Sequence, residues 1–119
     1  MIIITGDTVF QISDWIKHAC EANGVPELAN QISFHFNSRL YKTWGKAWQS
    51  KKKIEISTLL WLAHPEERRD TIIHEACHVI VTYKYGSEPN IEAHGIEWKM
   101  CMELAGLEPN IGGYIEIKV

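Results

Sequence analysis

The segment HEACH, residues 74–78, places two histidines four residues apart, with a glutamate directly after the first. Apolar residues surround it, and their spacing predicts a well-buried helix over residues 65–86. Residues four apart share one helix face, so His74 and His78 can present imidazole nitrogens to one metal ion. Glu75 reaches a water on that metal more easily than the metal itself. This division between two ligands and one general base is typical of the HExxH motif.

A catalytic zinc needs a third protein ligand, and the residues alone leave several candidates. His94 follows the motif after a loop that lets the chain fold back over the site, and Glu97 lies one helical turn further on. His35 on a predicted strand and His64 before the motif helix are the other two candidates. The sequence thus predicts one Zn²⁺ per chain without fixing the third ligand from the residues alone.

The rest of the chain predicts one α+β domain over residues 1–119, since it shows no internal repeat and no linker. Residues 31–40, 41–48 and 52–58 read as strands, and short connections between them favour a three-stranded antiparallel sheet. The helices are expected at residues 7–24, 65–86 and 94–106, the last bearing His94, and a final strand in the tail at 110–119.

Composition excludes several classes of protein. Cys20, Cys77 and Cys101 are odd in number and form no CxxC pair, which argues against a disulfide framework or a four-cysteine zinc ribbon. The start of the chain does not resemble a signal peptide, and no apolar run is long enough to span a membrane. We therefore expect a cytoplasmic protein. The net charge of −3 argues against a general nucleic-acid binder.

One segment departs from this acidic balance. Between residues 39 and 53 there are six basic residues and no acidic one, interleaved with Tyr41, Trp44 and Trp48; the basic residues are Arg39, Lys42, Lys46, Lys51, Lys52 and Lys53. Stacking aromatics paired with cations are typical of single-stranded DNA binders, so this segment is a candidate DNA contact. In the alternative interpretation, the tryptophans pack in the core and the lysines line a solvated turn.

The sequence resembles the SprT-like metallopeptidase domain, the family that includes the DNA-dependent protease Spartan. The resemblance rests on HExxH at residues 74–78, followed at the family's spacing by His94, Gly95 and Trp98. Upstream, the segments IEISTLLWLAHPEERRDTIIHE and NSRLYKTWGKAW resemble the family's strand, loop and helix and its preceding strand. The resemblance covers roughly residues 10 to 106 and implies a zincin-like fold.

Carried over to this chain, the resemblance implies that His74, His78 and His94 bind zinc and that Glu75 is the general base. It implies an endopeptidase that acts on proteins bound or crosslinked to DNA. Many family members carry a cysteine-rich zinc ribbon after the protease core, and these cysteines are missing here, which suggests a minimal core. Two alternatives stay open: a zinc peptidase without DNA dependence, and a non-catalytic zinc module closed by a fourth ligand, Glu97 or His35.

Overall fold

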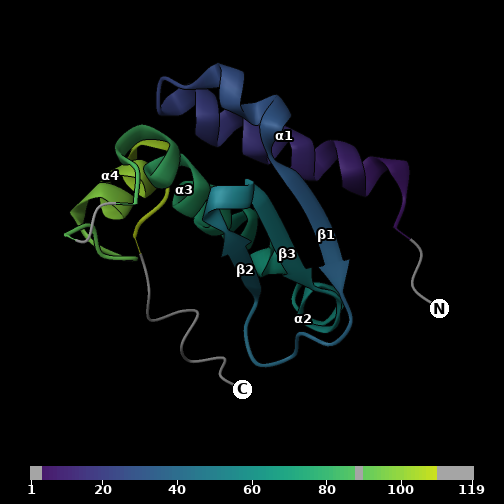
Figure 1. Cartoon of the computed structure of the whole chain (residues 1–119). Helices are drawn as coiled ribbons and strands as arrows, with labels where there is room; N and C mark the ends of the chain where they lie inside the picture. The colour runs from purple at the N-terminus through teal and green to yellow at the C-terminus, as the bar shows by residue number, and fades with distance from the viewer. Residues whose placement is uncertain (1–3, 88–89, 110–119) are drawn as a thin grey trace.

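The structure, a computed structural model, describes residues 4–87 and 90–109. The tail strand expected over residues 110–119 lies outside these ranges. The three strands in these ranges lie together in the middle part of the chain, with α-helices before and after them (Figure 1). In chain order the elements are α1 Gly6–Ala22, η1 Pro26–Gln31, β1 Ser33–Asn37, β2 Gly45–Trp48, η2 Gln49–Lys51, β3 Lys53–Ser57, α2 Thr58–Ala63, η3 Pro65–Glu67, α3 Arg68–Tyr85 and α4 Ile96–Leu104.

The sheet has the strand order β1-β3-β2 and is mixed, so the expected antiparallel sheet is wrong in one of its two pairings. β2 runs antiparallel to β3, from Gly45 opposite Ile56 to Trp48 opposite Lys53. β1 runs parallel to β3, with Phe34 opposite Ile54. A parallel pair usually needs a helical crossover, but here β2 itself carries the chain back between β1 and β3.

The two faces of the sheet differ as the alternation of its strands requires. Ile54 and Ile56 of β3 are buried, and Phe34 and Phe36 of β1 pack on the same core. The opposite face carries Lys53 and polar residues of all three strands, which are half-buried or exposed except for the buried Ser57 at the end of β3. The helices cover the apolar face, where α1 and α3 supply most of the remaining core.

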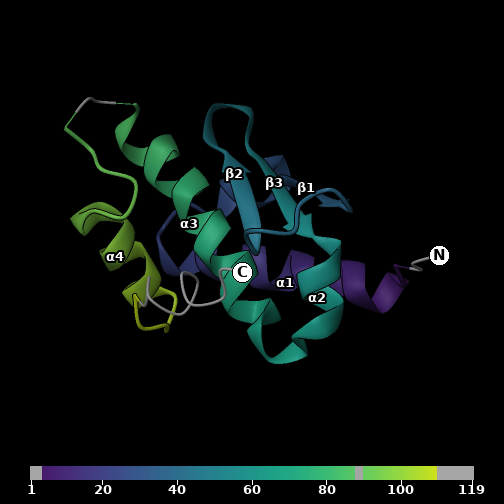
Figure 2. The same ribbon diagram turned by 90° about the horizontal axis from the view of Figure 1, so that it is seen from below.

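Helix α3 lies at the centre of the fold, because it contacts α1, α4 and the sheet. Residues 71–81 are all buried, which confirms the buried helix expected around HEACH. Seen from below, α4, α3 and the sheet follow one another across the molecule, with β2 next to α3 (Figure 2). Ile72, Ile73 and Ile80 are fully buried, and each contributes roughly 1.5–3 kcal/mol through the apolar surface it removes from water.

The segments flanking α3 differ from expectation in two ways. The expected loop before the motif helix contains α2, whose start is capped because the Ser57 hydroxyl accepts a hydrogen bond from the Leu60 amide at 3.1 Å. After α3, Gly86 closes the helix with a φ of 77°. The next helix begins only at Ile96, with Gly95 as its N-cap. His94 therefore lies in the turn before α4 and not on the helix that was expected to bear it.

The three cysteines, Cys20, Cys77 and Cys101, are buried and free. No helix in residues 4–87 and 90–109 is long and apolar enough to cross a membrane.

Candidate metal centre and cleft

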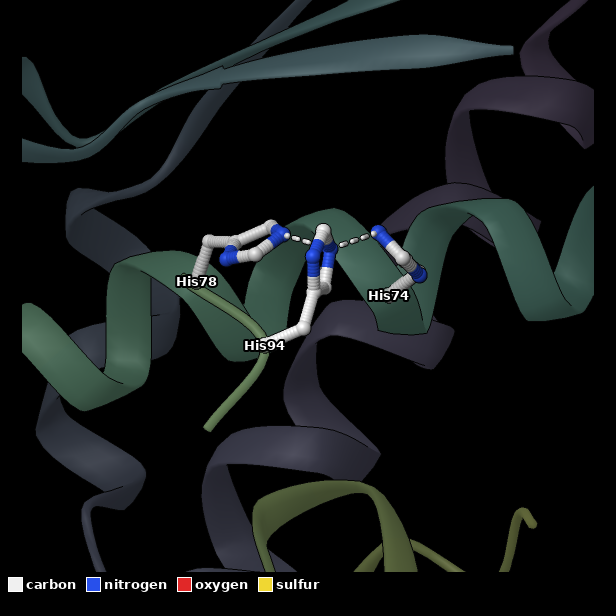
Figure 3. A group of neighbouring side chains, drawn as sticks. All are labelled: His74, His78 and His94. Atoms are coloured by element: carbon white, nitrogen blue, oxygen red, sulfur yellow. Dashed lines mark hydrogen bonds between the residues drawn. The ribbon is translucent and has the colours of Figure 1, made fainter. Parts of the chain in front are cut away.

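Three imidazoles converge beside α3 (Figure 3). His74 and His78 project from one face of the helix, one turn apart, and His94 reaches them from the turn before α4. The Nε2 atom of His94 lies 3.2 Å from the Nε2 of His78 and 3.2 Å from that of His74. The ligating nitrogens of all three lie within 4.8 Å of one another. The structure thus brings together the pair predicted from HEACH and one of the four candidates for the third ligand.

This spacing fits a shared metal ion. In a tetrahedral zinc site with Zn–N bonds of about 2.0–2.1 Å, neighbouring nitrogens are separated by roughly 3.3 Å. Burial lowers the pKa of His74 to about 2 and that of His78 to about 4, with the neighbouring histidines adding to the effect. Burial also lowers the pKa of His94. A neutral imidazole keeps the lone pair that binds a metal ion, so the lowered pKa values favour metal binding over protonation of the cluster.

The other proposed ligands do not join the cluster. In the described part of the chain, the group able to hold a metal contains neither Glu97 nor His35. Glu97 lies on α4 and lines a separate small pocket beside Asn23. His35 is exposed on the outer face of the sheet, and His64 packs its ring edge-on against Trp44. Three histidines without a fourth side chain resemble a catalytic site more than a closed structural one.

Trp98 packs against the rings of all three histidines. Trp98 is fully buried beside α3. Its ring centroid lies 4.7 Å from the rings of both His74 and His94, and it stacks on His78 at 5.7 Å. Its indole N–H donates to the His74 carbonyl at 3.2 Å. One rigid aromatic side chain therefore restricts the orientation of all three imidazoles.

Glu75 lies beside the cluster and is 6% exposed. Its Oε2 is 3.9 Å from the Nε2 of His74, and Glu75 is not one of the three residues grouped as possible metal ligands. Burial raises the pKa of this carboxyl to about 8. A carboxyl group whose pKa is near neutrality both accepts and releases protons readily, which is the property required of a general acid–base group.

Gly45 of β2 makes room for this carboxylate. A Cβ atom at Gly45 would lie 3.2 Å from the Glu75 Cγ and 3.0 Å from the backbone oxygen of Glu55. Both distances are shorter than ordinary van der Waals contact. The start of β2 can therefore approach the face of α3 that carries Glu75 only because residue 45 has no side chain. Sequence reasoning missed Gly45, since a lone glycine in a strand does not reveal its neighbour across the fold.

An open cleft of about 350 Å³ runs between β2 and α3. Its walls include Glu75 and the three histidines on one side and residues 43–47 with Gln49 on the other. β2 is an edge strand, and Trp44 accepts a hydrogen bond from the Ser57 amide of its partner. Alternation along an antiparallel ladder then directs the backbone groups of Gly45 and Ala47 outward. The backbone groups of Gly45 are already bonded to the Thr43 hydroxyl, which donates to the Gly45 carbonyl at 2.6 Å and accepts from the Gly45 N–H at 3.2 Å.

The basic and aromatic residues of segment 39–53 do not form one continuous surface. Trp44 is 4% exposed, which agrees with the core interpretation and leaves its ring unable to stack on a base. Trp44 precedes β2, whereas Lys46 and Trp48 lie on the same face of that strand. Lys52 points away from them, donating to the Gln31 side chain at 2.7 Å. Arg39 lies in an exposed loop.

Trp48 remains as the aromatic centre of a cationic surface. Trp48 is 36% exposed, and the ammonium groups of Lys46, Lys53 and Lys51 lie 4.2, 5.4 and 5.6 Å from the centroid of its ring. Its indole N–H donates to the Glu55 carboxylate at 2.9 Å, which orients the ring. We call these five residues the Trp48 cluster. Lys46 also lines the cleft, so this surface adjoins the metal centre.

Three side chains that could donate a hydrogen bond to a substrate oxygen, Arg39, Tyr83 and Tyr85, do not line the cleft. The Tyr83 hydroxyl donates to Glu27 at 2.9 Å on another side of α3. Tyr85 is exposed near the end of that helix, and Arg39 is exposed in the loop before β2.

Comparison with protein families gives one result: the model described as SprT-like family matches residues 11–117. The match contains HEACH, His94 and the whole of the cleft. No curated protein and no solved structure matches the chain.

Proposed function

The chain belongs to the SprT-like family, and from this premise we propose that it is a zinc-dependent endopeptidase acting on proteins bound or crosslinked to DNA. The observation that carries the peptidase part is the convergence of three imidazole nitrogens beside the buried Glu75 in an open cleft. Zinc is the metal that three histidines and an open fourth position suit best.

His74, His78 and His94 would hold the ion. When bound, zinc supplies Lewis acidity: it polarises a carbonyl and lowers the pKa of its water toward about 7. Glu75 takes the proton from that water and delivers it to the leaving amine. Its buried position supports this role, because a pKa near neutrality suits both halves of the transfer.

The edge of β2 offers a binding surface for the substrate backbone. Ala47 lines the cleft, and its outward N–H and C=O can pair with an extended peptide, which then adds a strand to the sheet. The Thr43 hydroxyl covers the equivalent groups of Gly45, so pairing begins at Ala47. Backbone pairing of this kind accepts many sequences, as an enzyme that removes diverse proteins requires.

The Trp48 cluster supports the DNA part of the proposal. Bases stack on exposed aromatic rings while lysines follow the phosphate backbone, which is how many proteins bind single strands. The lysines crowd an exposed indole beside the cleft. Arg39 and Lys42 are exposed in the loop that leads to β2 and extend the basic surface. A strand bound there would keep its protein cargo close to Glu75.

The first experiment tests the peptidase chemistry. The zinc-loaded chain and its Glu75→Gln variant are incubated with a DNA-binding protein, and fragments are separated by electrophoresis. We expect cleavage by the wild type, at least 100-fold less by the variant, and equal zinc content in both. A variant that cleaves as fast as the wild type would refute the assignment of Glu75. Zinc binding without any cleavage would favour the non-catalytic zinc module.

The second experiment tests the dependence on DNA. Cleavage is measured without DNA, with single-stranded DNA and with duplex DNA, and DNA affinity is measured by fluorescence anisotropy. Trp48→Ala should weaken single-strand binding roughly tenfold. Tyr85→Ala is the matched control, because Tyr85 is also exposed and carries a lysine 5.6 Å from its ring. Equal affinity of both variants for DNA would refute the assignment of the Trp48 cluster.

A zinc peptidase without DNA dependence is the second candidate. Two observations favour it: the net charge of −3 and the Glu55 carboxylate within the Trp48 cluster, which repels phosphate. It predicts equal cleavage rates with and without DNA, and weak DNA binding that changes little with salt.

A further inference from the structure

The cleft continues beyond His78 into a second pocket of about 290 Å³. This pocket lies along the C-terminal half of α3, between that helix, η2 and the chain around Glu92. Gln49, His78 and Ala93 line both the cleft and the second pocket. A peptide in the cleft can therefore place a side chain in the second pocket without leaving the metal centre.

The walls of the second pocket combine apolar and polar groups with one acid. Val81 and Ile91 supply apolar surface, and Gln49 and Thr82 supply hydrogen-bonding groups. Glu92 supplies the negative charge, and it forms no ion pair with any residue in the two described ranges. Lysine and arginine side chains, which have an apolar stem and a cationic head, match this combination.

The direction of β2 relative to α3 tells which part of a substrate reaches this pocket. Gly45 lies against Glu75, and Gln49, just past the end of β2, lies at the pocket beyond His78. β2 therefore runs in the same direction as α3. A peptide paired antiparallel to β2, the commoner strand pairing, runs the opposite way. Its residues before the scissile bond then lie over Gln49 and the second pocket.

We propose that the second pocket is a specificity subsite for a lysine or arginine on the N-terminal side of the scissile bond, selected by Glu92. This inference rests on the proposed endopeptidase activity and names its substrate class. Proteins that bind DNA are rich in these residues, because lysine and arginine neutralise the phosphates. The subsite would favour such proteins through a direct contact, independently of any DNA bound at the Trp48 cluster.

The experiment maps cleavage sites in an unfolded protein that contains basic and acidic residues in similar numbers. The zinc-loaded full chain is used without DNA and with single-stranded DNA, and the products are sequenced by mass spectrometry. The variants are Glu92→Gln and Glu92→Arg. Glu103→Arg is the matched control, because Glu103 is an exposed glutamate on α4 outside both pockets. Zinc content is measured for each, since Glu92 is close to His94 in sequence.

We expect lysine and arginine to be enriched roughly two- to fivefold at one position within three residues before the cut, the range of a partly exposed ion pair. Glu92→Gln should remove the enrichment, Glu92→Arg should favour acidic residues, and Glu103→Arg should match the wild type. Three results would overturn the subsite and leave the peptidase assignment intact. They are wild-type cleavage without this enrichment, enrichment after the cut instead of before it, and an unchanged profile in Glu92→Arg. Absence of any Glu75-dependent cleavage overturns the proposed function and the subsite together.

Discussion

Replacing Glu75 with glutamine should stabilise the metal-free protein while abolishing its activity. Burial raises the pKa of the Glu75 carboxyl from its ordinary value of 4.5 to about 8. Between these two values the unfolded chain releases the proton freely, whereas the folded chain retains it. Wild-type stability therefore falls as the pH rises from 4.5 to 8, and the neutral glutamine has no such dependence.

The magnitude follows from the size of the shift. Each pKa unit corresponds to about 1.4 kcal/mol, so the gain from Glu75→Gln should be near zero at pH 4.5 and about 3 kcal/mol at pH 7. It should reach roughly 5 kcal/mol above pH 8, where the folded carboxyl also ionises. The histidines titrate in both proteins, and the comparison of wild type with variant removes their contribution.

The assay is urea unfolding of both proteins in chelator, at half-unit steps from pH 5 to pH 8.5. The difference in free energy of unfolding between variant and wild type is plotted against pH. A rising difference that levels off near pH 8 is expected. A difference that stays flat across this range would refute the reasoning, because it would mean that the carboxylate is solvated through the cleft and ionises at its ordinary pKa.

Three further predictions concern the residues around Glu75. Gly45→Ala should lower kcat/KM about tenfold with zinc content unchanged, because the new Cβ displaces Glu75 by a few tenths of an ångström. Gly6→Ala is the neutral control, because a Cβ atom at Gly6 would have no neighbour within 4 Å. His94→Ala should weaken zinc binding at least 100-fold by competition with a chelating dye, with the melting temperature of the metal-free chain changed by only a few degrees. Trp98→Phe should cost about 1–3 kcal/mol in unfolding free energy and weaken zinc binding, because the His74 carbonyl loses its indole donor; unchanged zinc affinity would mean that the indole does not orient the histidines.

The features that the sequence predicted best are those that depend on local periodicity. HEACH on a buried helix follows from the spacing of apolar residues along one segment, and the structure confirms it over residues 71–81. The approach of His94 depends on the whole path of the chain between α3 and α4. The residues alone left four candidates for the third ligand, and only the family resemblance favoured His94. Its place in the turn before α4 puts it outside the helix that periodicity assigned to it.

Pairings between distant segments were harder to predict. The alternation in β1 and β3 was visible, but their parallel pairing was not, because it depends on β3 returning to lie between β1 and β2 in the sheet. Trp44 and Trp48 look equivalent in sequence, four residues apart among lysines. One is buried beside His64 and the other lies on the surface, since only Trp48 belongs to the outer face of β2. The contact of Gly45 with Glu75 joins two segments 30 residues apart and leaves no local signal.

The alternation of β2 also limits how this part of the chain can change. Gly45 and Ala47 face α3, and Lys46 and Trp48 face outward. Insertion or deletion of one residue in the strand would exchange the two faces. A lysine side chain would then stand where Glu75 needs open space, and the exposed indole would turn into the core. We therefore expect related chains to keep the length of these four residues, to vary in β2 by substitution, and to accept insertions in the loop over residues 38–43.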